Sequence, residues 1–369
     1  MDFFRIEISF EYILFLTFFV SFLVSYLSIP SIVRVAKEKK LFDKPDCRKS
    51  HNGKIPSLGG VAIFAGLTVA AGSFIDYSRH TSLLHTPSLQ YILVACIIMF
   101  FIGLKDDILI ISPMKKLMGQ MIAALILIIP GNLDFSNLHG FLGIYDISFV
   151  PGLLLTLFVI IVITNSFNLI DGIDGLATSI GMLSTAFFGL WFFLSGNEEY
   201  CLLSAAMLGA LSGFFKFNIF GGKYKIFMGD TGSLILGLMM AVQVILFNEK
   251  NIDLTSAFSV KSAPAVSFAV LIIPLFDTTR VFLLRMLRGK SPFSADNNHI
   301  HHCLLKIGFT HGQATILIVF TNLCFIALAF LLQNIGIVWL MIVILSVATI
   351  LSLYIAYLVR KQKCQSLDL

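Results

Sequence analysis

Charge is scarce in this sequence. Asp, Glu, Lys and Arg make up 13% of its 369 residues, whereas 57% are hydrophobic. Soluble domains carry about a quarter charged residues, so an ordinary soluble protein is excluded. A helix needs about 20 apolar residues to cross a hydrocarbon core, and eleven stretches approach that length. They lie near 11–35, 59–75, 89–105, 116–130, 151–167, 176–195, 200–220, 231–248, 263–284, 313–332 and 336–359. The sequence predicts an all-α, polytopic membrane protein with about eleven transmembrane helices.

Other absences narrow the class further. The alternating pattern of a membrane β-barrel is missing. The six cysteines form no CxxC pair, so disulfides are not expected. No GxxxxGK[ST] motif is present, which argues against P-loop nucleotide binding. With no soluble segment and no internal repeat, the chain is predicted to be one integral-membrane domain over residues 1–369.

Basic residues fall mostly on one side of the predicted membrane. If the eleven stretches span in turn, all but four of the 26 Lys and Arg residues share a face with the C-terminus. The exceptions are Arg5, Arg79, Lys250 and Lys261. Because cytoplasmic loops collect Lys and Arg, we predict an outer N-terminus and a cytoplasmic C-terminus. Such a positive face suits membrane lipid headgroups and anionic substrates, and nucleic acid is not expected as a partner.

The polar stretches that neither a span nor a turn explains all fall on this cytoplasmic face. They are "DKPDCRKSHNGKIPSLGG" (43–60), "GLKDDILIISPMKKLMGQ" (103–120), "NSFNLIDGIDGL" (165–176), "KIFMGDTGS" (225–233) and "FDTTRVFLLRMLRGKSPFSADNNHIHH" (276–302). They correspond to loops near 36–58, 105–116, 165–175, 221–231 and 277–312. Five loops converging at a membrane surface are typical of an enzyme. A transporter would instead place ionisable groups along a midplane pathway.

Asp106 and Asp107 form an acidic pair at the end of the third stretch. Adjacent carboxylates at the edge of a low-dielectric region repel each other, and one pKa tends to rise. One group of such a pair can accept a proton while the other holds a cation or substrate. The alternative is a solvated helix end, although a helix C-terminus disfavours anions.

Oxygen ligands recur in two other loops. Asn168 and Asp171 share a helix face if the fifth helix continues, and Asp230 begins the eighth stretch. Carboxylate and amide oxygens suit Mg²⁺. Asp230 could equally be a helix N-cap, because Asp favours that position.

The histidines of "NHIHH" (298–302) leave three interpretations open. His299, His301 and His302 could receive phosphate oxygens or manage protons together with Arg280. They could also bind zinc or serve only the structure, but no second Cys/His pair at zinc-site spacing accompanies them. Lys116 could anchor a phosphate or extend toward the membrane interface.

Taken together, these motifs resemble the polyprenyl-phosphate N-acetylhexosamine-1-phosphate transferases. The segments "GLKDD", "NSFNLIDGIDGLA", "FMGDTGS" and "PFSADNNHIHH", with the loop at 43–60, occur in that family's order and cover residues 41 to about 312. The resemblance implies that undecaprenyl phosphate attacks the β-phosphorus of a UDP-N-acetylhexosamine, most simply UDP-GlcNAc, and that UMP leaves. It also implies a Mg²⁺ cofactor that Mn²⁺ could replace and a bacterial inner-membrane location. The oligomeric state is left open, with a homodimer as one option.

The resemblance further implies roles for individual residues. Asp106, Asp107, Asp174 and His301 would be catalytic, and Asn168 and Asp230 would hold the metal. Substrate binding would fall to a third set: Lys116, Asp171, Arg280, His299 and His302.

One position departs from the family pattern. Asn297 stands where relatives with this loop commonly have arginine, so the donor sugar is open, and N-acetylfucosamine and MurNAc-pentapeptide remain alternatives. Arg280 or Arg288 could compensate for the missing guanidinium. A lipid-linked sugar transporter and an inactive scaffold are the alternatives from other classes.

Overall fold

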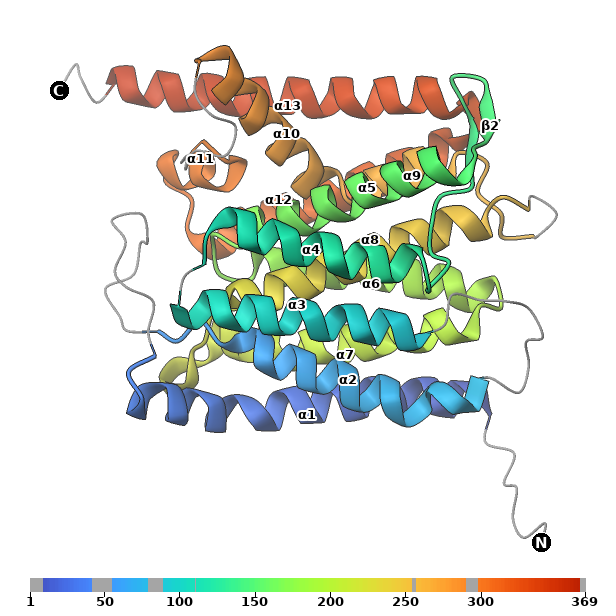
Figure 1. Cartoon of the computed structure of the whole chain (residues 1–369). Coiled ribbons are helices and arrows are strands. Elements are labelled where there is room, and N and C mark those ends of the chain that lie inside the picture. Colours follow the sequence, from blue (N-terminus) through green and yellow to red (C-terminus); the bar gives the residue numbers. More distant parts are fainter. Residues whose placement is uncertain are drawn as a thin grey trace, which may run out of the picture.

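The computed structural model describes residues 9–41, 55–78, 89–109, 111–253, 257–289 and 298–365 of the chain. Within these residues nearly all of the secondary structure is helical, and long helices run side by side through one bundle (Figure 1). The long helices are α1 (Phe10–Glu38), α2 (Gly59–Ser78), α3 (Leu89–Leu109), α4 (Pro113–Ile128), α5 (Phe149–Ile170), α6 (Leu176–Leu194), α7 (Glu198–Phe220), α8 (Gly229–Lys250), α12 (His311–Leu332) and α13 (Ile337–Gln365). The shorter ones are α9 (Ala263–Val270), α10 (Ile272–Leu287), α11 (Ile300–Lys306), η1 (Gly222–Tyr224) and η2 (Gln333–Ile335).

Each predicted stretch overlaps one of these helices, except that the ninth is divided between α9 and α10. Seven described helices are long and apolar enough to cross a membrane: α1, α5, α6, α7, α8, α12 and α13. The α9–α10 pair adds an eighth if it is counted as one span. The protein is therefore a multi-pass membrane protein. The count of eleven and the orientation of the termini stay predictions.

Helix α8 forms the centre of the bundle. In its most apolar window 94% of the residues are buried, against 28% for α1 and α13. Glycines let the neighbouring helices approach it closely. A Cβ on Gly103 of α3 would lie 2.4 Å from the Thr231 Cα, and one on Gly60 of α2 would lie 2.1 Å from the Gly232 nitrogen. Small residues at helix contacts are the usual way for membrane helices to pack without a hydrophobic driving force.

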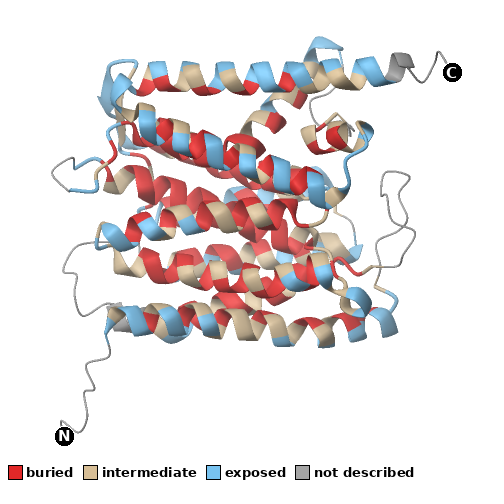
Figure 2. Cartoon of the chain, turned by 180° about the vertical axis from the view of Figure 1, so that it is seen from behind, coloured by how far each residue is buried: buried red, intermediate tan, exposed pale blue. Residues whose placement is uncertain are grey.

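The outer helices keep large apolar side chains on the surface. Phe320 of α12 and Trp339 of α13 are both more than half exposed, and Figure 2 shows exposed residues along α13 and buried ones in the middle of the bundle. On a soluble protein such an apolar surface would be a liability. On this chain it is the surface that meets lipid.

The expectation of an all-α fold is wrong in one place. Strands β1 (Asn137–Phe141) and β2 (Ile144–Asp146) pair antiparallel between α4 and α5. The turn between them needs left-handed backbone at Gly140, Leu142 and Gly143, and the two glycines adopt it without steric cost. A five-residue strand is too short for hydropathy to reveal.

The ninth predicted span is broken rather than continuous. Helices α9 and α10 meet at an angle of 81°. Pro274 has no N–H to donate to the Val270 carbonyl one turn earlier, and its ring would clash with that carbonyl. The freed oxygen accepts hydrogen bonds from Asn322 Nδ2 of α12 at 3.0 Å and from Ser184 Oγ of α6 at 3.3 Å. The corner is therefore fixed by its neighbours.

One end of the bundle collects the polar loops. The ends of α3, α5 and α7 and the starts of α4, α6, α8 and α12 all lie at the left of Figure 1, with α11 beside them. The β-hairpin lies at the opposite end. Four of the five predicted active-site loops are described in most of their length, and they share this end. The fifth, 36–58, falls largely on 42–54, outside the described residues.

Candidate active site

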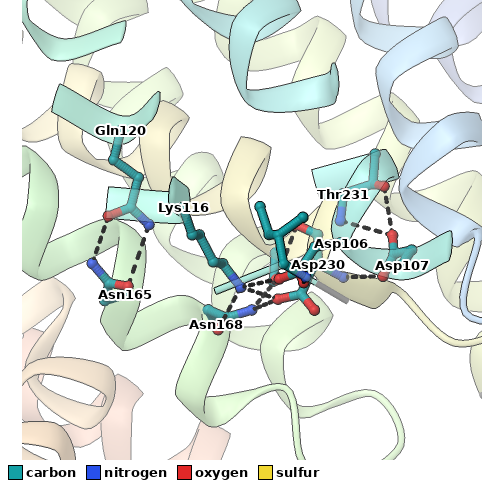
Figure 3. Close-up of polar contacts among 10 residues, drawn as sticks. Asp106, Asp107, Lys116, Gln120, Asn165, Asn168, Asp230 and Thr231 are labelled. Atoms are coloured by element: carbon teal, nitrogen blue, oxygen red, sulfur yellow. Dashed lines mark hydrogen bonds and ion pairs between the residues drawn. The ribbon is translucent and has the colours of Figure 1, made fainter. Parts of the chain in front are cut away.

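Lys116 lies at the centre of a polar cluster built from four helices. Its ammonium contacts the Asp106 carboxylate at 3.1 Å and the Asn168 amide oxygen at 3.3 Å, and it also pairs closely with Asp230 (Figure 3). These residues come from the end of α3, the start of α4, the end of α5 and the start of α8. The sequence prediction that distant motifs converge is confirmed for these four residues.

Asn168 also binds Asp230 directly. Its amide nitrogen donates to Asp230 Oδ1 at 2.5 Å and to Ser233 Oγ at 2.8 Å. The Asp230 side chain thus faces side chains of α4 and α5, although the residue lies in the first turn of α8, where Asp commonly caps a helix. Side-chain oxygens of Asp106, Asn168 and Asp230 therefore converge on one cation.

Asp107 supplies the helix cap that Asp230 does not. One of its oxygens accepts the Asp230 N–H at 2.7 Å, and the other accepts the N–H and the hydroxyl of Thr231 at 3.0 and 2.5 Å. The carboxylate thus binds orphan donors at the start of α8, where the helix dipole also favours an anion. Burial, followed by the nearby charge of Asp230, raises the pKa of Asp107 to about 7. Asp107 therefore sets the position of the turn that carries Asp230.

Two amide residues missed by the sequence analysis support the same cluster. Gln120 and Asn165 form a reciprocal pair, with nitrogen-to-oxygen distances of 3.3 and 2.9 Å (Figure 3). Gln120 is one turn beyond Lys116 on α4, and Asn165 is about one turn before Asn168 on α5. The pair fixes the register of the two helices next to the cluster. Both residues lie in polar stretches of the sequence, Asn165 at the start of 165–176 and Gln120 at the end of 103–120, but nothing local indicates that they pair.

The "IDGID" turn leads from this cluster to a second one. Asp171 is the C-cap of α5, and Gly175 begins α6 with φ = 77°. Between them, Asp174 Oδ2 pairs with Lys225 Nζ at 2.6 Å and lies 3.8 Å from His311 Nδ1. The Asp174 carbonyl also accepts the Thr315 hydroxyl at 3.0 Å. No role was predicted for Lys225, His311 or Thr315, although Lys225 opens the stretch "KIFMGDTGS", because only the folded chain brings them to Asp174.

The histidine segment packs onto the same turn. A Cβ on Gly172 would lie 2.4 Å from His301 Nε2, so only glycine leaves room for this ring. The His301 ring lies 4.3 Å from the His302 ring and stacks at 5.6 Å on that of His299. Burial, together with the neighbouring His302, lowers the pKa of His301 to about 3. His301 is therefore neutral at physiological pH, and its buried Nε2 has no hydrogen-bond partner among the described residues.

Asp277 and Arg280 of α10 hold the start of that segment. The Asp277 carboxylate accepts hydrogen bonds from His299 Nδ1 at 2.9 Å and from the Ile300 N–H at 3.0 Å. Arg280 pairs with Asp277 at 2.9 Å and also donates to the Asn298 carbonyl. Arg280 was predicted to bind substrate, and here its guanidinium contacts the protein. Asn297 and residues 290–296 lie outside the described residues, whereas Arg288 is exposed at the end of α10.

The donor set fits a hard divalent cation. Mg²⁺ takes one or two carboxylates with other oxygens and keeps several waters, and the oxygens of Asn168 and Asp230 already converge on a cation. In the described part of the chain no group of three or more His, Cys, Asp or Glu residues is arranged to hold a metal. With one amide and one carboxylate as ligands, Asn168 and Asp230 suit Mg²⁺ better than zinc, which favours Cys and His.

Comparison with known proteins decides the family. The model of glycosyl transferase family 4 matches residues 89–248. An undecaprenyl-phosphate alpha-N-acetylglucosaminyl 1-phosphate transferase of Escherichia coli O157:H7 is 32% identical, covering 86% of this chain and 84% of its own length. The chain belongs to glycosyl transferase family 4. A Bacillus subtilis (strain 168) protein, named as a probable undecaprenyl-phosphate N-acetylglucosaminyl 1-phosphate transferase, is 30% identical over 91% of this chain and 90% of its own length.

The family assignment confirms the resemblance drawn from the motifs. The family 4 match includes Asp106, Lys116, Asn168 and Asp230 but ends before Asp277 and the histidine segment. The individual roles predicted for the eleven site residues stay predictions.

Proposed function

We propose that this family 4 protein transfers N-acetylhexosamine 1-phosphate, most simply GlcNAc 1-phosphate, from a UDP-sugar to undecaprenyl phosphate. A phosphate oxygen of the lipid forms a bond to the β-phosphorus, the pyrophosphate bond of the donor breaks, and UMP leaves. The convergence of Asp106, Lys116, Asn168 and Asp230 at one end of the bundle carries this proposal. The names of the relatives support the acceptor and the sugar.

The reaction requires the protein to supply positive charge near the phosphates. The donor diphosphate and the acceptor phosphate repel each other, so phosphoryl transfer depends on positioning and neutralisation. Lys116 brings a cation to the centre of the cluster, and Asp106 and Asp230 hold it there. We assign Asp106, rather than Asp107, to the acceptor side, because Asp106 contacts Lys116 at the centre of the cluster, whereas Asp107 binds the first turn of α8.

We also propose a Mg²⁺ ion, replaceable by Mn²⁺, held by Asn168 and Asp230. When bound, the ion would neutralise phosphate oxygens of the donor. The chain's own part is to place the amide and carboxylate oxygens, which Ser233 and Asp107 orient through Asn168 and the α8 backbone.

The second cluster suits the UDP-sugar. Lys225, paired with Asp174, offers a cation beside the turn that follows Asn168, and neutral His301 lies against Gly172. Asp171, His299 and His302 border the same region. The basic loops favour a site on the cytoplasmic face of the bacterial inner membrane. UDP-sugars would reach that face from the cytoplasm. A homodimer stays one option for the oligomeric state.

The decisive test is UMP release by the purified protein. Undecaprenyl phosphate, Mg²⁺ and a panel of UDP-sugars are supplied in detergent, with EDTA as the metal control. We expect UMP with UDP-GlcNAc and none after chelation. Absence of UMP with every donor would overturn the transferase proposal, and turnover of UDP-MurNAc-pentapeptide alone would overturn the choice of sugar.

A further inference from the structure

Asp277 is a buried carboxylate that lies within the polar stretch 276–302 but to which the sequence assigned no role. Only 1% of the residue is exposed, and a carboxylate so deep in a protein is costly unless it is paired and hydrogen-bonded. Its two oxygens have different hydrogen-bond partners. Oδ1 accepts the Ile300 N–H and an Arg280 N–H, whereas Oδ2 contacts His299 Nδ1.

This contact fixes the tautomer of His299. An ionised carboxylate can accept but not donate, so Nδ1 of the ring must carry the hydrogen. In the tautomer with the hydrogen on Nδ1, Nε2 carries a lone pair. Carboxylate–histidine pairs of this kind are a common way to set ring orientation and tautomer.

The same carboxylate fixes the position of the ring. His299 is the N-cap residue of α11, and Ile300 is its first helical residue. Asp277 binds both of them, and Arg280 binds the carbonyl of Asn298 just before. Three consecutive residues are thus tied to α10, and the His299 ring stacks on His301, which rests on Gly172.

We propose that Asp277 is a positioning residue, which holds His299 with its Nδ1 protonated and its Nε2 available as an acceptor toward the donor substrate. This proposal rests on the proposed function, which supplies the UDP-sugar as the donor substrate. It extends that function by assigning the Nε2 atom to a hydroxyl or amide N–H of the donor, rather than to a phosphate oxygen, which offers no hydrogen.

The Asp277→Asn substitution tests the role of the His299 tautomer. The amide oxygen can keep both bonds made by Oδ1, while the NH₂ group takes the place of Oδ2 and donates to Nδ1. The ring should then switch to the tautomer protonated on Nε2. We expect kcat/KM for the UDP-sugar to fall about 10²-fold, with a raised KM for the donor, because Nε2–H cannot accept the donor's hydrogen. Asp146→Asn is the control, because Asp146 is an exposed hairpin residue that accepts from Asn137 at 2.7 Å.

The tautomer itself is read by ¹⁵N NMR of histidine-labelled protein in detergent. The His299 signal is the one lost in His299→Gln. Nδ1–H in the wild type, and Nε2–H in Asp277→Asn, support the proposal. Nε2–H in the wild type overturns it, and so does a variant that keeps the wild-type kcat/KM within threefold.

A second variant guards against simple unfolding. His299→Asn places an amide nitrogen close to the position of Nδ1, so it can keep the bond to Asp277 while removing Nε2. We expect wild-type thermal stability and a kcat/KM as low as that of Asp277→Asn. A wild-type kcat/KM in this variant would contradict the proposal. If the wild type itself releases no UMP, the proposed function fails, while the NMR spectrum still decides the tautomer.

Discussion

The two ends of α8 each hold a carboxylate, but they use it differently. Asp230 at the start binds side chains of α4 and α5. Glu249 at the other end, about 28 Å away at 1.5 Å per residue, accepts the N–H and hydroxyl of Ser136 at 3.0 and 2.6 Å. At the first end, charged and amide side chains from distant segments contact one another. At the second end, one carboxylate is hydrogen-bonded to a single residue of a loop. Only the first arrangement therefore places charged side chains where they could bind a charged substrate.

The strongest test of this comparison neutralises each carboxylate in turn. Asp230→Asn should lower the kcat for UMP release about 10³-fold or more, because a charge at the centre of the cluster is lost. Glu249→Gln should leave kcat within threefold and lower only the thermal midpoint, since it weakens a hydrogen bond to Ser136. Equal losses of activity at the two ends would remove the distinction.

Two adjacent lysines sharpen the same point. Lys116→Met removes the ammonium that contacts Asp106, Asn168 and Asp230, and we expect turnover to fall about 10²-fold. Lys115→Met changes an exposed neighbour on the same helix and should have little effect. The measurement is kcat/KM for both substrates, and comparable losses in the two variants would show that only surface charge matters.

The glycine that accommodates His301 should be the next most sensitive position. Gly172→Ala would force the ring away, because the new Cβ would lie 2.4 Å from Nε2. We expect turnover to fall about tenfold, since displacements of the order of an ångström are costly in active sites. Gly72→Ala is the matched control, as a Cβ there meets nothing within 4 Å. Steady-state UMP assays of both variants decide the matter.

The smallest expected effect is on stability at acid pH. Burial and His302 lower the pKa of His301 to about 3 in the folded protein, whereas the unfolded side chain titrates near its usual 6.5. The unfolded state therefore binds the extra proton first, and stability should fall as the pH drops below about 6.5 toward 3. Thermal melts in detergent between pH 7 and 5 should show a shallower fall for His301→Asn. Identical slopes in the two proteins would contradict the assignment.

Hydropathy predicts where most of the helices lie, because the length of an apolar stretch is a local property. It did not reveal the corner at Val270, although Pro274 was visible, because proline is tolerated in membrane helices when neighbouring helices satisfy the freed carbonyl. The satisfying residues, Asn322 and Ser184, are far away in the sequence. The hairpin was missed because its strands are short.

The candidate site was predictable where chemistry clusters within one motif. Asp106, Asn168 and Asp230 each stand in an unusual polar stretch, and the structure brings them together. Asp277 and Gln120 lie within the polar stretches 276–302 and 103–120, but their roles could not be predicted, because their contacts with His299 and Asn165 are made only in the folded protein. The sequence also could not tell Asp106 from Asp107, since only tertiary contacts show which one caps α8.

The corner at Pro274 has a consequence for how such proteins could diversify. Helix α10, which carries Asp277, and helix α11, which follows His299, come after a corner that α6 and α12 anchor. Substitutions in α10 and α11 would therefore move the His299 and His301 rings against Gly172 while the corner at Val270 stays anchored. Exchange of α10 and α11 between relatives would therefore change the sugar specificity of the protein.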